Sequence, residues 1–263
     1  MSETLRLLPS LRLVRRDADH LQLGVDPPRV AVLKDLPEVR RLVEGLAVGK
    51  RPQRLGVETS VALAAIIDAD LLEPIGSASQ RDRLRTARIR LEGPVDVTAG
   101  VAALLAAAGV QQLAAKDAAD VVLLVTAGEV ERARLDGYMR DEVPHLLVRD
   151  HGRELVVGPF VVPGTTACLR CVDCHHGDAD PRRGLVVEQV ATTAPLVTVG
   201  PDPTLRAVAL SLATRDLVTF VEGGTPATWS ATITVTPALE LEPRRWLRHA
   251  ACGCAWDAVV RTG

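Results

Sequence analysis

Apolar and polar residues alternate along the first thirty-odd residues of the chain. Residues 11–15 (LRLVR) and 21–25 (LQLGV) place an apolar side chain at every second position, which is the period of a strand half buried on one face. A third short apolar segment, residues 29–33 (RVAVL), follows Pro27 and Pro28. The pattern predicts three short strands, with polar residues 16–19 as the turn between the first two.

The hydrophobic period then changes to that of a helix. Apolar residues after Pro37 recur at spacings of three and four, which places them on one face of a helix that ends at Gly49. A second helix is expected from about Ser60 to Leu72, with Thr59 or Ser60 as its N-cap. Three strands and two helices indicate a winged-helix-like unit in residues 1–80, and we expect polar residues 76–82 to form the linker at its end.

Strand and helix patterns alternate in residues 81–263. Residues 121–125 (VVLLV) form a continuous apolar run, typical of a strand buried on both faces of a parallel sheet. The other expected strands lie at 88–91, 145–148 and 154–162, and residues 232–241 are expected to form two strands or one bent edge strand around Pro237. Helices are expected at 99–108, 129–142 and 203–221. This order predicts an α/β domain with a Rossmann-type sheet.

Composition narrows the function classes. Hydrophobic residues make up 47% of the 263 residues but aromatic residues only 2%, so the core must consist of Val, Leu, Ile and Ala. A net charge of −2 offers no basic surface for nucleic acid or an anionic membrane. The longest nonpolar stretch, residues 101–110, is too short to span a bilayer, and charges interrupt every apolar run near the N-terminus. We therefore expect a cytoplasmic protein that binds neither nucleic acid nor membrane.

Cysteine spacing gives the clearest chemical signal. Cys168 and Cys171 form a C-x2-C turn, which lets two thiolates face one metal ion, and Cys252 and Cys254 form a C-x-C pair. We expect these four to hold one structural zinc ion, with no open coordination position for catalysis. Free buried thiols are the alternative, and the fifth cysteine, Cys174, can replace a member of the four.

The first strand–helix turn of the α/β region does not suit phosphate binding. Residues 91–100 (LEGPVDVTAG) contain two glycines only, Pro94 lacks an N–H donor, and Glu92 and Asp96 add negative charge. Asp117 lies at the position expected for a ribose-binding acid, but the next strand follows too closely to leave room for more of such a site. We expect no ATP site.

The run GPFVVPGTTACLRCVDCHHGDADP, the late ACGCAW and the helix ending in LAAAG together resemble the ThiF-like partner proteins of azoline-forming peptide biosynthesis. The resemblance covers about residues 5–256. It implies a winged-helix peptide-recognition element followed by a degenerate activating-enzyme-like domain with a tetracysteine zinc. It also implies that the chain binds the leader of a ribosomally made precursor peptide and presents the core to a YcaO-type cyclodehydratase, which uses ATP to cyclise Cys, Ser or Thr.

This chain departs from the family pattern at two points. No clear middle helix lies between Gly49 and Glu58, and the α/β part is shortened after Asp117, so the arginine and lysine that activating enzymes use on ATP have no evident counterparts. The second departure agrees with the unsuitable glycine turn. Both indicate a scaffold that performs no chemistry itself.

The segment 29–33 is the expected leader-binding strand. It looks like a sheet edge, whose unpaired N–H and C=O groups can accept an added strand. The helix of residues 60–72 would form the other wall of the groove, although its apolar side chains can equally fill the small core. The candidate peptide-binding residues are Arg29, Val30, Ala31, Val32, Leu33, Leu63 and Ile67.

Two other functions remain open at this point. One is a divergent adenylating enzyme that activates a carboxylate with ATP and works through a thiol such as Cys174; nucleotide binding would distinguish it. The other is a zinc-containing winged-helix regulator that binds DNA, against which the acidic charge balance argues. His175 and His176 are expected to be exposed loop histidines, with a role as spare ligands as the alternative. The sequence leaves open whether the chain forms a homodimer.

Overall fold

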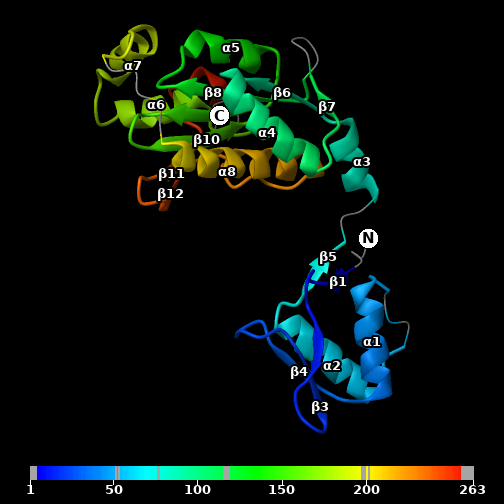
Figure 1. The fold of residues 1–263 in the computed structure, drawn as a ribbon. Coiled ribbons are helices and arrows are strands. Elements are labelled where there is room, and N and C mark those ends of the chain that lie inside the picture. The colour runs from blue at the N-terminus through cyan, green and yellow to red at the C-terminus, as the bar shows by residue number, and fades with distance from the viewer. Residues whose placement is uncertain are drawn as a thin grey trace, which may run out of the picture. The chain divides into compact units, whose positions relative to one another are not determined.

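The computed structural model describes residues 5–50, 52, 54–75, 78–114, 119–196, 200 and 202–255. The chain divides into two compact units, Met1–Ala78 and Ser79–Gly263. Both units combine strands and helices (Figure 1). Among the described helices, none has both the length and the apolar character needed to cross a membrane.

The first unit is a three-stranded antiparallel sheet with two helices and a small two-stranded ribbon. The sheet has the order β2–β3–β4, with β2 at Leu13–Arg15, β3 at His20–Leu23 and β4 at Ala31–Lys34. The helices are α1 (Pro37–Ala47) and α2 (Val57–Asp68), and the ribbon pairs β1 (Leu5–Leu7) with β5 (Leu72–Pro74). One core joins all of these elements, and its fully buried members include Leu21, Leu23, Ile66 and Leu71.

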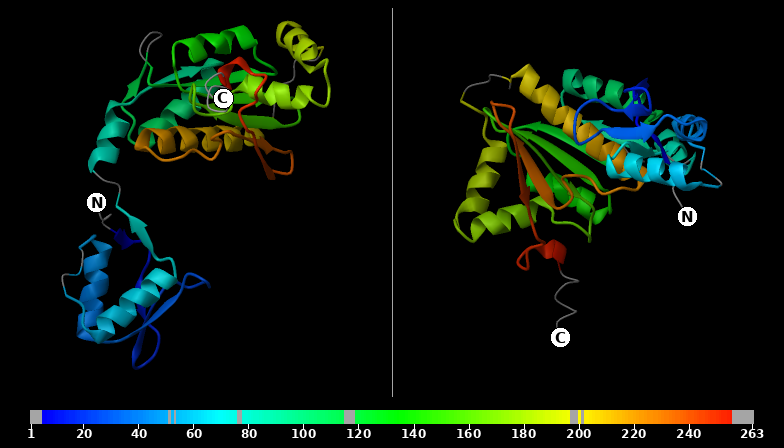
Figure 2. Two further views of the ribbon diagram at one scale, coloured as in Figure 1. Left: turned by 180° about the vertical axis from the view of Figure 1, so that it is seen from behind. Right: turned by 90° about the horizontal axis from the view of Figure 1, so that it is seen from below.

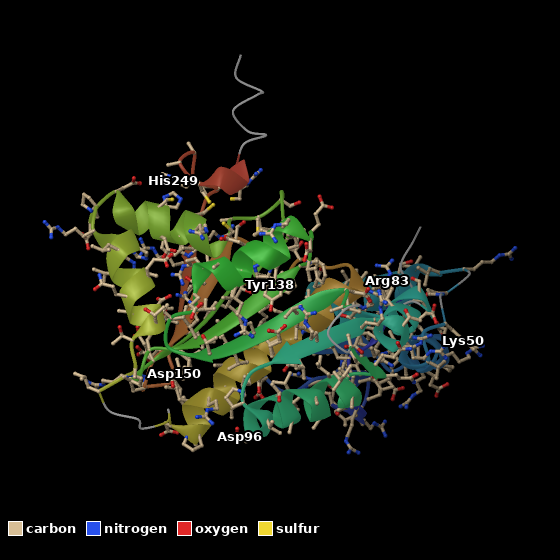
Figure 3. All side chains as sticks on the ribbon, turned by 90° about the horizontal axis from the view of Figure 1, so that it is seen from above. Lys50, Arg83, Asp96, Tyr138, Asp150 and His249 are labelled. Carbon is tan, nitrogen blue, oxygen red and sulfur yellow. The ribbon has the colours of Figure 1, made fainter. Side chains whose placement is uncertain are left out.

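Two expected boundaries in this region are wrong. Helix α2 begins at Val57 after an N-cap at Gly56, and Thr59 lies within the first turn, where its hydroxyl donates to the Gly56 carbonyl oxygen at 3.0 Å. The expected linker at 76–82 contains the start of helix α3 (Ala78–Thr86). Arg83 of α3 donates to the Glu222 carbonyl oxygen at 3.0 Å, which ties this helix to the second unit (Figure 3).

The second unit is built on a seven-stranded mixed sheet, so the predicted α/β class is confirmed. Its strand order is β12–β11–β10–β9–β8–β6–β7. The strands β7, β6, β8 and β9 run parallel, whereas β10, β11 and β12 continue the sheet antiparallel. The bounds are β6 Arg88–Glu92, β7 Gln112–Leu113, β8 Val121–Ala127, β9 His145–Asp150, β10 Leu155–Val161, β11 Ala231–Val235 and β12 Leu241–Arg245.

Helices cover both faces of this sheet (Figures 1 and 2). Helices α4 (Val95–Ala107) and α8 (Pro203–Glu222) pack together on one face, and α5 (Arg132–Arg140) and α6 (Leu169–Gly177) lie on the other. Helix α7 (Arg183–Thr192) follows α6 and packs against it. This sandwich explains why residues 121–125 are buried throughout, as their continuous apolar run predicts.

Strand β12 forms one outer edge of the sheet and carries a proline at its centre. Trp246 N–H donates to the Ser230 carbonyl oxygen at 2.8 Å, so the alternating ladder turns the main chain of Pro243 outward. A proline is tolerated at this position because its missing N–H would face solvent. The region expected to be two strands or one bent strand around Pro237 is thus two strands, β11 and β12.

Gly158 in β10 provides a stability test. Its φ is +96°, and an added Cβ would lie 2.4 Å from the Ala231 carbonyl oxygen. Gly158→Ala should therefore lower the free energy of unfolding by about 3 kcal/mol through overpacking and a left-handed backbone. Gly100→Ala in α4 is the matched control, because a Cβ there meets nothing within 4 Å and should stabilise the helix by about 1 kcal/mol. Denaturant unfolding with a loss of stability in both variants, or in neither, would contradict this account.

Candidate functional site

Four cysteine sulfurs lie close together where the last described residues of the chain pack against the start of α6. Cys168 is the N-cap of α6, Cys171 lies one turn later, and Cys252 and Cys254 flank the start of a short 3-10 turn, Gly253–Ala255. The Cys168 Sγ lies 3.8, 3.6 and 3.4 Å from those of Cys171, Cys252 and Cys254, and all four Sγ atoms fall within 4.8 Å of one another. Zinc bound tetrahedrally at about 2.3 Å would place its sulfurs about 3.8 Å apart. The group could therefore bind a metal ion such as zinc.

The protonation chemistry of the group also suits a cation. The hydrogen bond from Cys168 lowers the pKa of Cys171 and lowers that of Cys252 to about 7, while the contact with Cys171 raises the pKa of Cys168. The His249 backbone N–H points at the Cys171 Sγ from 3.4 Å, a donor that stabilises a thiolate. A divalent cation would offset the repulsion that prevents four neighbouring thiols from ionising together.

Cys174 stands outside this group. It lies on α6 and is half-buried, and burial raises the pKa of its thiol. A raised pKa lowers the thiolate fraction at neutral pH, which weakens Cys174 as a nucleophile.

A second cluster, His175, Asp178 and His249, also has ligand atoms within 4.8 Å of one another. The possible ligand atoms of both histidines are already engaged in hydrogen bonds. His175 Nε2 lies 2.9 Å from the Leu247 carbonyl oxygen, and His249 Nε2 lies 3.2 Å from Asp178. The Ala251 N–H donates to His249 Nδ1, so the proton of His249 is on Nε2. The cluster therefore joins α6 to the C-terminal loop (Figure 3). The expectation of exposed loop histidines is wrong, because His175 and His176 are half-buried on α6.

The point where strand order reverses, between the carboxyl ends of β6 and β8, is the usual ligand position in such a sheet. Glu92 ends β6 there and is paired with Arg134 and, at 2.8 Å, with Arg90. Burial alone would raise the pKa of Glu92, but the hydrogen bond from Arg134 holds it below its usual value. A carboxylate held by two arginines thus lies at the carboxyl end of β6.

Gly93, the next residue, is explained by packing against β8. A Cβ on Gly93 would lie 3.0 Å from the Val125 carbonyl oxygen and 3.1 Å from its Cβ. A Cβ on Gly100 would meet nothing within 4 Å. Asp117 lies outside the described residues.

A buried ion network follows the carboxyl end of β8, and sequence reasoning missed it. Arg132 donates to Asp173 at 2.6 and 2.9 Å and to Glu129 at 2.9 Å, while Arg149 donates to Glu129 at 3.1 Å. Arg132 and Arg149 are buried, so each needs these partners. The network connects β8, β9, α5 and α6 and thereby positions the helix that carries Cys168 and Cys171.

Strand β4 of the first unit has an open edge. The Asp35 N–H donates to the Asp19 carbonyl oxygen, on the β3 side of the strand, at 2.8 Å. Because the ladder alternates, the main-chain groups of Ala31 and Leu33 face β3, whereas those of Val32 face outward. Ala31 and Leu33 are buried in the core, whereas the Val32 side chain is 42% exposed. The expected strand at 29–33 is shifted, because β4 runs from Ala31 to Lys34.

Helix α2 lies beside this edge, and ion pairs join their ends. Arg29 lies 3.0 Å from Asp70, just beyond α2, and Lys34 lies 2.6 Å from Glu58 in its first turn. The remaining candidates differ from one another: Val30 is half-buried, Leu63 packs partly into the core, and Ile67 is 54% exposed.

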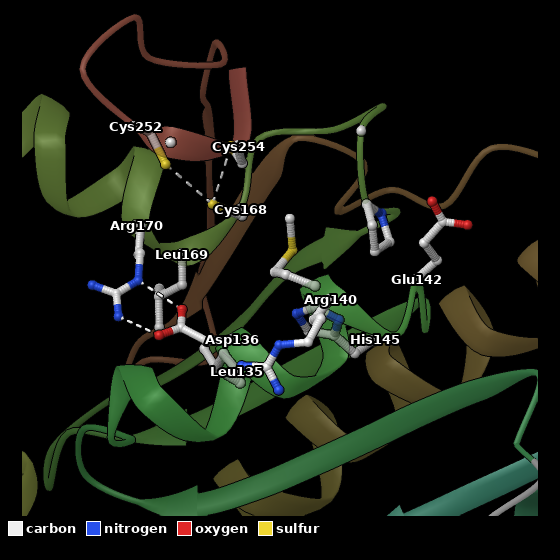
Figure 4. Close-up of a pocket in the computed structure, with 14 residues that line it drawn as sticks. Leu135, Asp136, Arg140, Glu142, His145, Cys168, Leu169, Arg170, Cys252 and Cys254 are labelled. Atoms are coloured by element: carbon white, nitrogen blue, oxygen red, sulfur yellow. Dashed lines mark hydrogen bonds and ion pairs between the residues drawn. The ribbon is translucent and has the colours of Figure 1, made fainter. Parts of the chain in front are cut away.

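A cavity of about 460 Å³ opens between α5 and the cysteine group (Figure 4). Its walls include Leu135 and Met139 of α5, the Pro163–Gly164 turn and Leu169 of α6. His145, the first residue of β9, also lines it and is buried. Burial lowers the pKa of His145 to about 4, so its ring is neutral near pH 7.

Comparison with known proteins shows a shared fold. Neither a protein-family model nor a curated protein matches the chain. The structure of the heterocyclase TruD matches with a TM-score of 0.66 at 16% identity, over 96% of this chain and 43% of that one. E. coli MccB with succinimide matches with a TM-score of 0.65 at 11% identity, over 96% of this chain and 99% of that one. MccB with MccA-N7isoASN matches with a TM-score of 0.63 at 12% identity, over 95% of this chain and 99% of that one. This chain therefore spans less than half of the heterocyclase and nearly all of MccB.

Proposed function

We propose that the protein is a leader-peptide-binding scaffold in the biosynthesis of azoline-containing peptides. In this proposal residues 1–80 act as a winged-helix-like recognition element, and residues 81–263 form a degenerate ThiF-like domain. The protein works in the cytoplasm and presents a ribosomally made precursor to a YcaO-type cyclodehydratase. The observation that carries the proposal is the open edge of β4 beside α2.

The backbone of β4 supports strand addition at one residue above all. Both main-chain groups of Val32 face away from β3, and no described residue pairs with them across a strand ladder. An extended leader segment can therefore form its hydrogen bonds on Val32. The exposed side chains of Val61 and Ile67 on α2 offer apolar contacts for the leader's side chains.

One structural neighbour supports this pathway, because TruD is a heterocyclase. MccB, which shares the fold, has been solved with MccA bound. In this proposal a YcaO-type enzyme supplies the cyclising activity.

We further propose that the four-cysteine group holds zinc in a structural role. All four sulfurs would be ligands, which leaves no position for a substrate or water. The ion would join α6 to the C-terminal segment around Cys252.

Proline substitution on the two edges of the first sheet tests leader binding. Val32→Pro removes an outward N–H and should lower affinity for the leader at least about tenfold while the sheet stays intact. Arg15→Pro is the matched control, because Arg15 faces outward on the opposite edge strand β2 and should leave affinity unchanged. Ala31 is unsuitable, since its N–H faces β3.

Fluorescence polarisation with a labelled synthetic leader, taken from the precursor gene that neighbours this one, measures the effect. Equal losses in Val32→Pro and Arg15→Pro, or no loss in either, would place the recognition surface elsewhere.

Metal analysis tests the zinc assignment. The purified protein should contain one zinc per chain, and Cys171→Ser should lose both the metal and solubility, because metal binding and folding are coupled. Cys174→Ser should retain one zinc, since Cys174 is outside the group of four. If zinc is lost only in Cys174→Ser, or if the folded wild-type protein contains none, the assignment of the four ligands is wrong.

Calorimetry with ATP and magnesium separates the scaffold from an adenylating enzyme. MccB, which has been solved with ATP, shares the fold, but Glu92 and the packing of Gly93 oppose a phosphate site here. We expect no heat of binding at millimolar nucleotide. Micromolar affinity, or pyrophosphate release when peptide is present, would favour the enzyme.

A further inference from the structure

The cavity between α5 and the cysteine group has the properties of a ligand site. Its volume of about 460 Å³ lies within the range of about 300–1,000 Å³ that small-molecule sites occupy. Its lining includes the apolar side chains of Leu135, Met139, Pro163 and Leu169, together with the three cysteines Cys168, Cys252 and Cys254. Apart from its mouth, the cavity therefore suits an uncharged, apolar group.

The ring of His145, which lines the cavity, determines which polar group the ligand must carry. His145 Nδ1 lies 2.9 Å from the Val143 carbonyl oxygen, which can only accept, so the ring hydrogen is on Nδ1. The neutral ring then has a lone pair on Nε2. Val143 is the one hydrogen-bond partner of this imidazole among the described residues. No described residue donates to this nitrogen, so a bound molecule that supplies an N–H or O–H can form a hydrogen bond with it.

The mouth of the cavity disfavours a charged ligand. Asp136 and Arg170 form a two-bond ion pair, at 2.9 and 2.7 Å, and so neutralise each other. The other charged lining residues, Arg140 and Glu142, are exposed and of opposite sign (Figure 4). The mouth therefore carries no net charge.

We propose that this cavity binds the aromatic side chain of a peptide, tryptophan or tyrosine, whose N–H or O–H donates to His145 Nε2. The ring fills the space between Leu135, Met139 and Leu169, and the peptide backbone remains at the mouth between Arg140 and Arg170. This site is separate from the β4 edge and does not depend on the proposed function.

Binding of matched probes to the full chain tests the proposal. N-acetyltryptophanamide and indole should bind and shift the NMR signals of the cavity residues, and 1-methylindole, which lacks the N–H, should bind about five- to tenfold more weakly than indole. Equal affinity of indole and 1-methylindole, no binding at millimolar concentration, or shifts at other residues would each overturn it. If indole binds but N-acetyltryptophanamide does not, the ligand is not the side chain of a peptide.

Substitution of the acceptor gives an independent measurement. His145→Phe preserves an aromatic ring of similar size, so indole and 1-methylindole should then bind equally. His20→Phe, at a half-buried histidine of the first unit, should leave their ratio unchanged. Zinc content and circular dichroism establish that each variant is folded, and the two-probe comparison on the unaltered chain decides the question if His145→Phe does not fold.

Trp256 lies outside the described residues and follows the cavity-lining Cys254 by two positions. The probes are therefore also measured on Trp256→Ala. Equal binding to both chains supports an external ligand, whereas probe binding that appears only in Trp256→Ala would overturn the proposal in favour of the chain's own indole.

Discussion

A single buried guanidinium organises the face of the second sheet that carries the cysteines. Arg132 is enclosed between β8 and α6, and its nitrogens are met by Glu129, Asp173 and the Val130 carbonyl oxygen. Removing one partner from such a buried pair costs about 3–5 kcal/mol, because the remaining charge is left in a poorly polarisable interior. The position of α6, and with it the spacing of Cys168 and Cys171, depends on this arrangement.

Paired charges also shape the turn that follows β6. In a doubly wound sheet, the point where strand order reverses is open to a ligand. Here Arg134 and Arg90 are used to neutralise Glu92, and Gly93 allows the turn to pack directly on Val125. Side chains of the protein itself thus fill this turn.

Sequence reasoning succeeded where the signal is local and failed where partners are distant. The run at 121–125 and the two cysteine pairs were readable because burial and ligand spacing act over a few residues. Helix α6 was missed because its sequence, LRCVDCHHG, lacks a helical apolar period, and α3 was taken for a linker because it is almost wholly polar. The pairing of β1 with β5 and the bond between Arg132 and Asp173 join residues far apart in the chain, which no short pattern records.

Pro243 limits how two copies of this chain can associate. Antiparallel joining of β12 to a second β12 would merge two seven-stranded sheets into one continuous sheet, the route by which many edge strands self-associate. The central outward position of β12 cannot donate a hydrogen bond, so that merger lacks its middle contact. Strand pairing between two copies at this edge would therefore be weakest at its centre, and side-chain contacts would have to make up for the missing backbone bond there.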